Sequence, residues 1–472
     1  MNDDESAPLP LTLALLPIVV LAGGIVAGAA VFGFGGDPLL LALLAAGIVA
    51  TVIARWRGHG WGEIQRDTGA LIAEALPALL VLLSIGALLG SWMFSGTIPL
   101  LVVLGIDIIS PQWMALTAFL ATALMSVVTG TSWGSAGTIG VALMGAGEAM
   151  GLPLAPVAGA VVSGAYFGDK LSPLSDMTNI AAIGAGAELY AHVRHMLATS
   201  IPPALLALAA YALLAPGGAI GVSPAGEIRA ELASLFVLSP WAALPLLVAI
   251  IGIALRWPPA PVIVGSALVA IFIGIALQGF PAAAGIGAFV GGFDLALAAP
   301  GVAASEQVTS LVERGGLMSM APTLVYVVAA FLLAAAMRVS GALDRLLEVM
   351  LSAVRGAFGL VAATMAAGAT MVGITSHGGV TALVVGGLFR QSYAERGLAP
   401  ENLSRAIEDS ATVTEPLMPW TVSALFMAST LGVATLAYLP WAVFCWLGPV
   451  FGLLMTLRFR LTGKGLRLAR GE

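Results

Sequence analysis

The sequence SGAYFGDKLSPLSDMTN, residues 163–179, places charged and helix-breaking residues in the middle of an apolar segment. That segment, 154–186, would be ~50 Å long as one helix, which exceeds the ~30 Å hydrocarbon core of a bilayer. Gly168 and Pro173 therefore predict a break within a membrane-crossing helix. A charge at this depth is costly unless it faces a cavity or a partner, so the break is a predicted functional site.

The break gathers oxygen atoms of the kind that hard cations prefer. Unwound backbone leaves carbonyl groups free, and six side chains add oxygens: Asp169, Ser172, Ser175, Asp176, Thr178 and Asn179. By analogy with other hard ions, this pattern predicts a site for a hard cation such as Na⁺. Lys170 is either the counter-charge of Asp169 or a competitor that binds when the ion leaves. The alternative interpretation is an ordinary polar loop between two shorter spans.

The composition excludes a soluble globular enzyme. Of 472 residues, 59% are hydrophobic and 9% are charged, against about 25% charged residues in ordinary soluble domains. A mean hydropathy of +1.02 and apolar runs of roughly 20 residues indicate a polytopic membrane protein. The net charge of −6 argues against a nucleic-acid partner. Cys445 is the single cysteine, which excludes an intramolecular disulfide and a thiolate metal cluster.

The second half of the chain repeats parts of the first at a nearly constant spacing. The matched groups, at offsets of 245, 244, 244 and 243, are Ser95-Gly96 with Ser340-Gly341, Thr131-Ser132 with Thr375-Ser376, Leu154-Ala155-Pro156 with Leu398-Ala399-Pro400, and Ser172-Pro173-Leu174 with Glu415-Pro416-Leu417. Composition alone does not explain a register that holds within two residues over this length. Internal repeats on this scale are typical of secondary transporters.

Basic residues predict that the two halves have opposite orientations. The arginines within residues 55–66 place the loop after the second span inside the cell. A hairpin at 112–149 follows a stretch without Lys or Arg and is predicted to open outward. A second hairpin at 357–390 is flanked by four arginines and is predicted to open inward. Both chain termini are predicted to be cytoplasmic, in a multi-pass protein of the inner (plasma) membrane.

The sequence thus predicts an all-α polytopic membrane protein. We expect about ten spanning helices plus two re-entrant hairpins in two inverted repeats, with broken helices at the centre. In chain order, the predicted parts are N-terminal spans (1–66), the first inverted repeat (67–214), connecting spans with an outer linker (215–317), the second inverted repeat (318–457) and a cytoplasmic tail (458–472).

The second repeat contains a comparable break and hairpin tip. Its predicted ion- or substrate-binding residues are Thr412, Thr414 and Glu415 at the break and Ser376 and His377 at the tip. At the first tip they are Thr131 and Ser132. Helix N-termini at such tips present N–H groups to an anion, and broken helix ends present carbonyls to a cation. Hydroxyl side chains in membrane helices also bond to their own backbone. Glu408 and Asp409 either join this site or lie at the inner interface.

One histidine is placed deep in the membrane by this topology. His377 serves there either as a proton relay or as an ordinary hydrogen-bonding residue. His192 and His195 are assigned to an inner loop and carry no functional prediction.

The chain resembles the NhaC family of Na⁺/H⁺ antiporters from about residue 74 to 438. Three motifs carry the resemblance: GTSWGSAGTIGVALMG (130–145), SGAYFGDKLSPLSD (163–176) and LSRAIEDSATVTEPLMPW (403–420). The resemblance implies a fold of the ion transporter superfamily, with re-entrant hairpins and broken helices in inverted repeats. It also implies ion binding at Asp169, Asp176, Thr178 and Asn179, with Thr131 and Ser132 nearby. Asp169, Asp176 and Asn179 are the Na⁺ ligands expected on this basis. Members of the family also exchange organic acids such as malate and lactate against cations.

Two functions follow, and neither is enzymatic. The first is exchange of cytoplasmic Na⁺ for H⁺ by alternating access, with carboxylates that bind either ion but not both. The second is Na⁺- or H⁺-coupled transport or exchange of a small organic acid or amino acid. Glu415 departs from the family pattern and adds a carboxylate that either carries the exchanged proton or binds an amino group. No cofactor is expected, because Na⁺ and H⁺ are transported ions. The lipid bilayer is the expected surrounding partner, and the sequence is compatible with a homodimer.

Overall fold

The computed structural model describes residues 8–32, 37–213, 225–298, 304–352 and 354–469. Regular structure in these ranges is helical, apart from one isolated bridge between Leu398 and Leu468. Nine of the described helices are long and apolar enough to cross a membrane, and two bent helix pairs would raise the number to 11. The chain is therefore an all-helical, multi-pass membrane protein, as its composition predicts.

The first repeat contains a long helix, a short helix, a hairpin, a broken helix and a closing helix. These elements are α3 (Trp61–Phe94), α4 (Thr97–Ile108), α5 (Met114–Thr129), α6 (Ser132–Ser135), α7 (Val141–Ala149), α8 (Leu154–Leu171), α9 (Asp176–Ala185) and α10 (Leu189–Leu213). A π-helical turn joins α6 to α7. The break lies between α8 and α9 and does not include Gly168. That glycine lies inside α8, where a Cβ atom would be 2.5 Å from the Ser126 side chain of α5.

The second repeat contains the same series of elements. They are α16 (Ala321–Val339), α17 (Ala342–Ser352), α18 (Gly356–Thr375), α19 (Gly378–Ala394), α20 (Pro400–Ile407), α21 (Val422–Leu431), α22 (Thr435–Tyr438) and α23 (Val443–Thr462). The hairpin predicted at 357–390 is formed by α18 and α19. A π-helical turn, Glu408–Thr412, extends α20 to the second break.

Seven further helices of the described ranges lie outside the repeats. They are α1 (Leu11–Phe32), α2 (Asp37–Trp56), α11 (Ala225–Leu235), α12 (Leu244–Ala254), α13 (Pro259–Ile273), α14 (Ala282–Gly291) and α15 (Glu306–Val312). Helix α2 packs on α1 and α16, whereas α13 and α14 pack on α3. The segment that contains α12 bends by 99° from α11, so the span predicted at 240–255 begins at a sharp turn.

From the hairpin tips onward, backbone conformations relate the two repeats by an offset of 246 (377 − 131 = 246), whereas the left-handed Gly96 and Gly341 after α3 and α16 are 245 apart. Thr131 has φ −144° and ψ 121°, and His377 has φ −144° and ψ 119°. The residue before each of them, Gly130 or Ser376, ends its helix in the left-handed conformation. The same offset relates further helix ends: Gly151 with Gly397, Ser175 with Thr421, and Gly186 with Gly432.

This register corrects the offsets of 243 and 244 inferred from short sequence matches. In the structure, Ser132 corresponds to Gly378, and Asp169 rather than Ser172 corresponds to Glu415. Similar tripeptides such as Ser-Pro-Leu and Glu-Pro-Leu lie at slightly different positions of the two breaks, because the breaks unwind differently.

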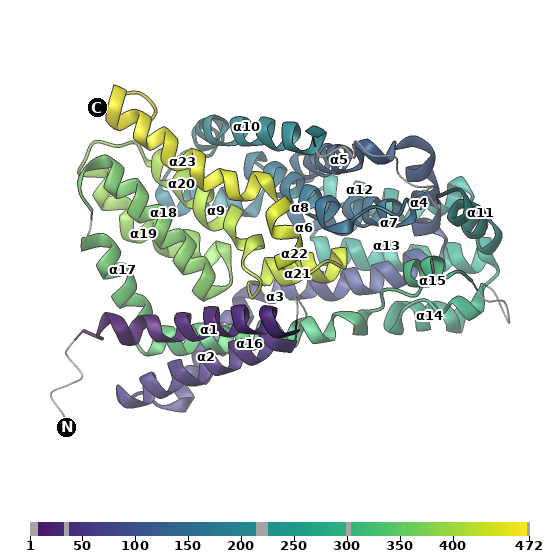
Figure 1. The fold of residues 1–472 in the computed structure, drawn as a ribbon, viewed down its shortest axis with the longest axis horizontal. Helices are drawn as coiled ribbons and strands as arrows, with labels where there is room; N and C mark the ends of the chain where they lie inside the picture. Colours follow the sequence, from purple (N-terminus) through teal and green to yellow (C-terminus); the bar gives the residue numbers. More distant parts are fainter. Residues whose placement is uncertain (1–7, 33–36, 214–224, 299–303, 353, 470–472) are drawn as a thin grey trace.

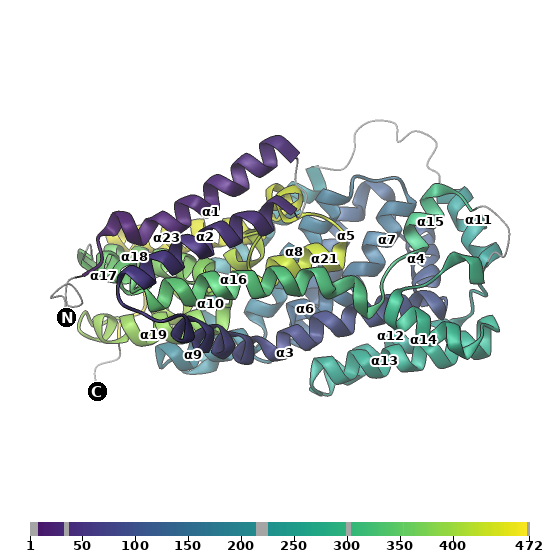
Figure 2. The same cartoon turned by 90° about the horizontal axis from the view of Figure 1, so that it is seen from below.

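The two hairpins lie toward opposite ends of the molecule. Figure 1 shows α5 and α7 at one end of the long axis and α18 and α19 at the other, and the perpendicular view agrees (Figure 2). Each end has its own buried apolar cluster, and the Trp133 side chain packs against both clusters. Its ring stacks on Phe426 of α21 with a centroid distance of 4.1 Å. The hairpin tips and the breaks therefore meet near the middle of the molecule.

Candidate functional site

Asp169, near the end of α8, faces the tip of the first hairpin. Its side chain is 5% exposed, and its Oδ2 accepts a hydrogen bond of 2.8 Å from the Ser132 hydroxyl. The backbone N–H of Ser132 and the hydroxyl of Ser175 also face this carboxylate as donors. The structure therefore brings Asp169, Ser132 and Ser175 together, as predicted, around one buried negative charge.

The other predicted residues of the first break shape its backbone. The Thr178 hydroxyl lies 3.2 Å from the carbonyl oxygens of Asp169 and Lys170, which links the two halves of the broken helix. The Asn179 amide donates to the carbonyl oxygens of Pro173 and Ser175. Ser172 donates to a carbonyl of α5 at 2.9 Å. These bonds link the break to the start of α9 and to the end of α5.

Asp176 lies apart from this group. It occupies the first turn of α9, where a carboxylate interacts favourably with the helix dipole, and its side chain is exposed. Asn179 uses both amide hydrogens on backbone carbonyls, which leaves only its Oδ1 to bind an ion. Of the predicted Na⁺ ligands, Asp169 is a buried carboxylate, Asp176 is an exposed carboxylate, and Asn179 stabilises the backbone of the break.

Glu415 occupies the equivalent position in the second repeat. Its side chain is 6% exposed, and the backbone N–H of Gly378 and the hydroxyl of Ser423 face its carboxylate as donors. Because Gly378 corresponds to Ser132, each hairpin tip directs the same backbone N–H at a buried carboxylate of its own repeat. The Thr421 hydroxyl donates to the Glu415 carbonyl oxygen at 2.6 Å and secures the break. The two repeats thus form two similar half-sites.

The remaining predicted residues at the tips cap helices. The Thr131 hydroxyl accepts from the N–H of Gly134, and the Nδ1 of His377 accepts from the N–H of Gly379, both at 3.2 Å. His377 is therefore a hydrogen-bonding residue in this conformation, with Nδ1 unprotonated. Ser376 is one of two described non-glycine residues with positive φ, and its hydroxyl donates to the Trp420 carbonyl.

A buried ion cluster joins the two repeats next to these half-sites. Lys170 Nζ lies 2.5 Å from Asp409 Oδ1, and Arg405 Nη1 lies 3.1 Å from Asp409 Oδ2; all three side chains are fully buried. Thr199 of α10 also donates to Oδ1 at 3.0 Å. The partner of Lys170 is therefore Asp409 rather than Asp169. Asp409 and Glu408 belong to the interior and not to the interface with water.

Three further predictions are modified by this packing. His192 and His195 do not lie in a loop: α10 begins at Leu189 and buries both rings, which bond to Ser404 and Asn402 of α20. Their distant partners explain why local sequence did not reveal them. Thr412 is buried beside Glu408 without a hydrogen bond of good geometry. The Thr414 hydroxyl donates to the Ser410 carbonyl within its own helix.

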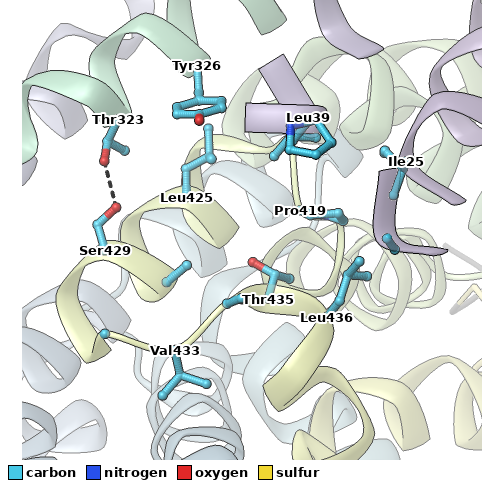
Figure 3. A pocket seen from close by; sticks show the side chains of 15 residues that line it. Ile25, Leu39, Thr323, Tyr326, Pro419, Leu425, Ser429, Val433, Thr435 and Leu436 are labelled. Atoms are coloured by element: carbon cyan, nitrogen blue, oxygen red, sulfur yellow. Dashed lines mark hydrogen bonds between the residues drawn. The ribbon is translucent and has the colours of Figure 1, made fainter. Parts of the chain in front are cut away.

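A largely apolar pocket lies between the N-terminal helices and α21 (Figure 3). Its polar feature is a 2.6 Å hydrogen bond between Thr323 of α16 and Ser429 of α21. Tyr326 and Thr435 also line it, whereas none of the sequence-predicted site residues does. The pocket therefore adjoins the second repeat without forming part of the two half-sites.

Comparison with known proteins agrees with this architecture. Residues 164–458 match the model of the Na⁺/H⁺ antiporter family. An uncharacterised Na⁺/H⁺ antiporter of Haemophilus influenzae is 39% identical over 96% of this chain and 97% of its own. The Na⁺/H⁺ antiporter NhaC of Alkalihalophilus pseudofirmus is 35% identical over 91% and 90%. The malate-2H⁺/Na⁺-lactate antiporter of Bacillus subtilis is 31% identical over 90% of each chain.

Proposed function

The chain belongs to the Na⁺/H⁺ antiporter family, and from this premise we propose that it exchanges cytoplasmic Na⁺ for H⁺ by alternating access. Asp169 carries the proposal, because its buried carboxylate meets hydroxyl oxygens of Ser132 and Ser175 beside an unwound backbone. Oxygen donors of this kind suit a small hard cation. A carboxylate binds either a cation or a proton, so one site can exchange them.

Glu415 supplies the second carboxylate of the ion-binding region. It corresponds to Asp169, and the two charges act on each other across the centre of the molecule. We place Na⁺ at the Asp169 half-site, with Glu415 and the second hairpin tip completing the region. Asp176 and Asn179 remain proposed ligands for a conformation in which the first break opens further.

Transport of an organic acid is the less favoured function. One relative is named a malate-2H⁺/Na⁺-lactate antiporter. In this chain, the carboxylate of such a substrate would bind at the helix N-termini of the hairpin tips. In this chain, the N–H of Gly378 already faces Glu415, and that of Ser132 faces Asp169. A second anion at either tip would lie next to a buried carboxylate of like charge.

We place both chain termini in the cytoplasm of a plasma-membrane protein. The start of α1 and the end of α23 lie at the same end of the molecule, as does the open end of the α18–α19 hairpin (Figure 1). That end carries the exposed basic residues Arg396 and Arg458, in keeping with the preference of Lys and Arg for the cytoplasmic side.

The proposal is tested with purified protein in proteoliposomes that contain a pH-sensitive dye. External Na⁺ is expected to raise the internal pH as H⁺ leaves, whereas malate, lactate and amino acids should not be taken up. Asp169→Asn should abolish the pH change, because a neutral amide cannot replace the ion-binding carboxylate. Uptake of an acid without Na⁺-linked pH change would instead support the organic-acid function.

A further inference from the structure

Glu408 is a buried acid that the two half-sites do not use. Its side chain is completely buried in the π-helical turn after α20, and neither carboxylate oxygen has a hydrogen bond of good geometry. The nearest polar neighbour is Thr412 on the same turn, whose hydroxyl is also unpaired. An ionised carboxylate in this position would lack the partners that normally compensate its loss of hydration.

The charged groups around Glu408 pair with one another rather than with Glu408, although Arg405 Nε and Nη2 have no hydrogen-bond partner among the described residues. Lys170 and Asp169 act on it from α8, and Asp409 acts on it from its own turn. Lys170 is paired with Asp409, which Arg405 also contacts. Helix α18, which packs against the turn, contains no ionisable residue in its sequence. Glu408 is therefore close to a cluster of two cations and one anion but has no hydrogen bond to it.

Glu415 lies in a different environment. Its carboxylate lies against Gly378 at the second hairpin tip and close to Ser423, as that of Asp169 lies at the first tip. The helix N-terminus at such a tip can stabilise a negative charge in the absence of a proton. The geometry thus separates two acid types: carboxylates held by hairpin tips, suited to a metal cation, and one without partners, suited to a proton.

We propose that Glu408 carries the proton that this chain exchanges for Na⁺. The inference rests on the proposed antiport function and names the proton site within it. When Na⁺ leaves Asp169, one positive charge is lost from the buried region. An O–H bond formed on Glu408 with a proton from water restores that charge, and release of the proton accompanies the next Na⁺. The total buried charge stays constant through the cycle.

The test measures two fluxes in proteoliposomes: H⁺ movement driven by a Na⁺ gradient, and tracer Na⁺/Na⁺ exchange, which needs no proton. Glu408→Gln, which keeps the shape of the side chain, should lose Na⁺-driven H⁺ movement and retain tracer exchange. Glu415→Gln is the matched control and should lose both fluxes, because its carboxylate belongs to the ion-binding region. Glu408→Asp should keep H⁺ movement with a shifted pH profile.

Several outcomes would overturn the proposal. Na⁺-driven H⁺ movement by Glu408→Gln at the wild-type rate would do so, as would selective loss of H⁺ movement in Glu415→Gln. Loss of both fluxes in folded Glu408→Gln would assign Glu408 to Na⁺ binding instead. If Glu408→Gln does not fold, an unchanged pH profile in Glu408→Asp refutes the proton role. Absence of Na⁺-driven H⁺ movement in the wild-type protein would refute the antiport function itself.

Discussion

Asp409 contacts both cationic side chains of the buried ion cluster, Lys170 and Arg405. Its carboxylate accepts from Lys170 of the first repeat, Arg405 of the second and Thr199 of α10. Burying charges costs several kcal/mol per ion, so each of them depends on the geometry of its partners. The cluster therefore holds three separate parts of the chain in one arrangement beside the half-sites.

Neutralising Asp409 should cost more stability than neutralising Lys170. Asp409→Asn leaves two buried cations without a counter-charge, whereas Lys170→Met leaves Asp409 paired with Arg405 and fills similar volume. Removing one partner of a buried pair typically costs about 3–5 kcal/mol, so we expect a clear fall in the unfolding temperature of Asp409→Asn in detergent. An equal fall in the unfolding temperatures of Asp409→Asn and Lys170→Met would contradict this prediction.

At the scale of elements, each hairpin depends on one left-handed residue before its tip. Gly130 has φ 70° and Ser376 has φ 57°. A Cβ atom on Gly130 would lie 2.7 Å from the backbone of Leu174 in the first break, so this hairpin tip packs directly against the broken helix. The second tip accommodates a serine, because Ser376 instead forms hydrogen bonds with Trp420 and Val422.

Substitutions at these two positions should differ in their effect on stability. Gly130→Ala adds a left-handed penalty of roughly 1–2 kcal/mol and a backbone clash, so it should lower the unfolding temperature. Ser376→Gly removes such a penalty at a comparable cost in chain entropy and should leave stability nearly unchanged. Thermal unfolding of both variants in the same detergent provides the comparison; greater destabilisation by Ser376→Gly would refute the interpretation.

At the scale of the whole molecule, the two repeats place their hairpins at opposite ends while their tips meet near the centre (Figures 1 and 2). A central ion site between such hairpins can open to either side if one end of the molecule loosens while the other stays packed. The buried apolar cluster at each end supports this separation.

Cysteines at the open ends of the two hairpins should react from opposite sides of the membrane. Gln112, before α5, and Glu395, after α19, have exposed side chains, and the native Cys445 is fully buried. In a Cys445→Ala background, an impermeant thiol reagent is expected to label Gln112→Cys from outside and Glu395→Cys from inside. Labelling of both from the same face would refute the inverted arrangement.

Local sequence determined the class of the protein, both hairpins and both broken helices. Apolar length, glycine and proline act on the residues next to them, so the breaks before α9 and before α21 are visible without tertiary information. The family resemblance, rather than this local reasoning, implied that Ser132 lies near Asp169, and in the structure the Ser132 hydroxyl donates to the Asp169 carboxylate.

Tertiary structure alone decided the register of the repeats and the partners of the buried charges. Lys170 and Asp409 are 239 positions apart, and no local pattern distinguishes this pairing from one between Lys170 and its neighbour Asp169. Whether Asp176 faces water and Glu408 the interior depends on which helices pack over each turn. The burial and pairing of these side chains depend on how the helices pack together. A single segment of sequence does not specify that packing.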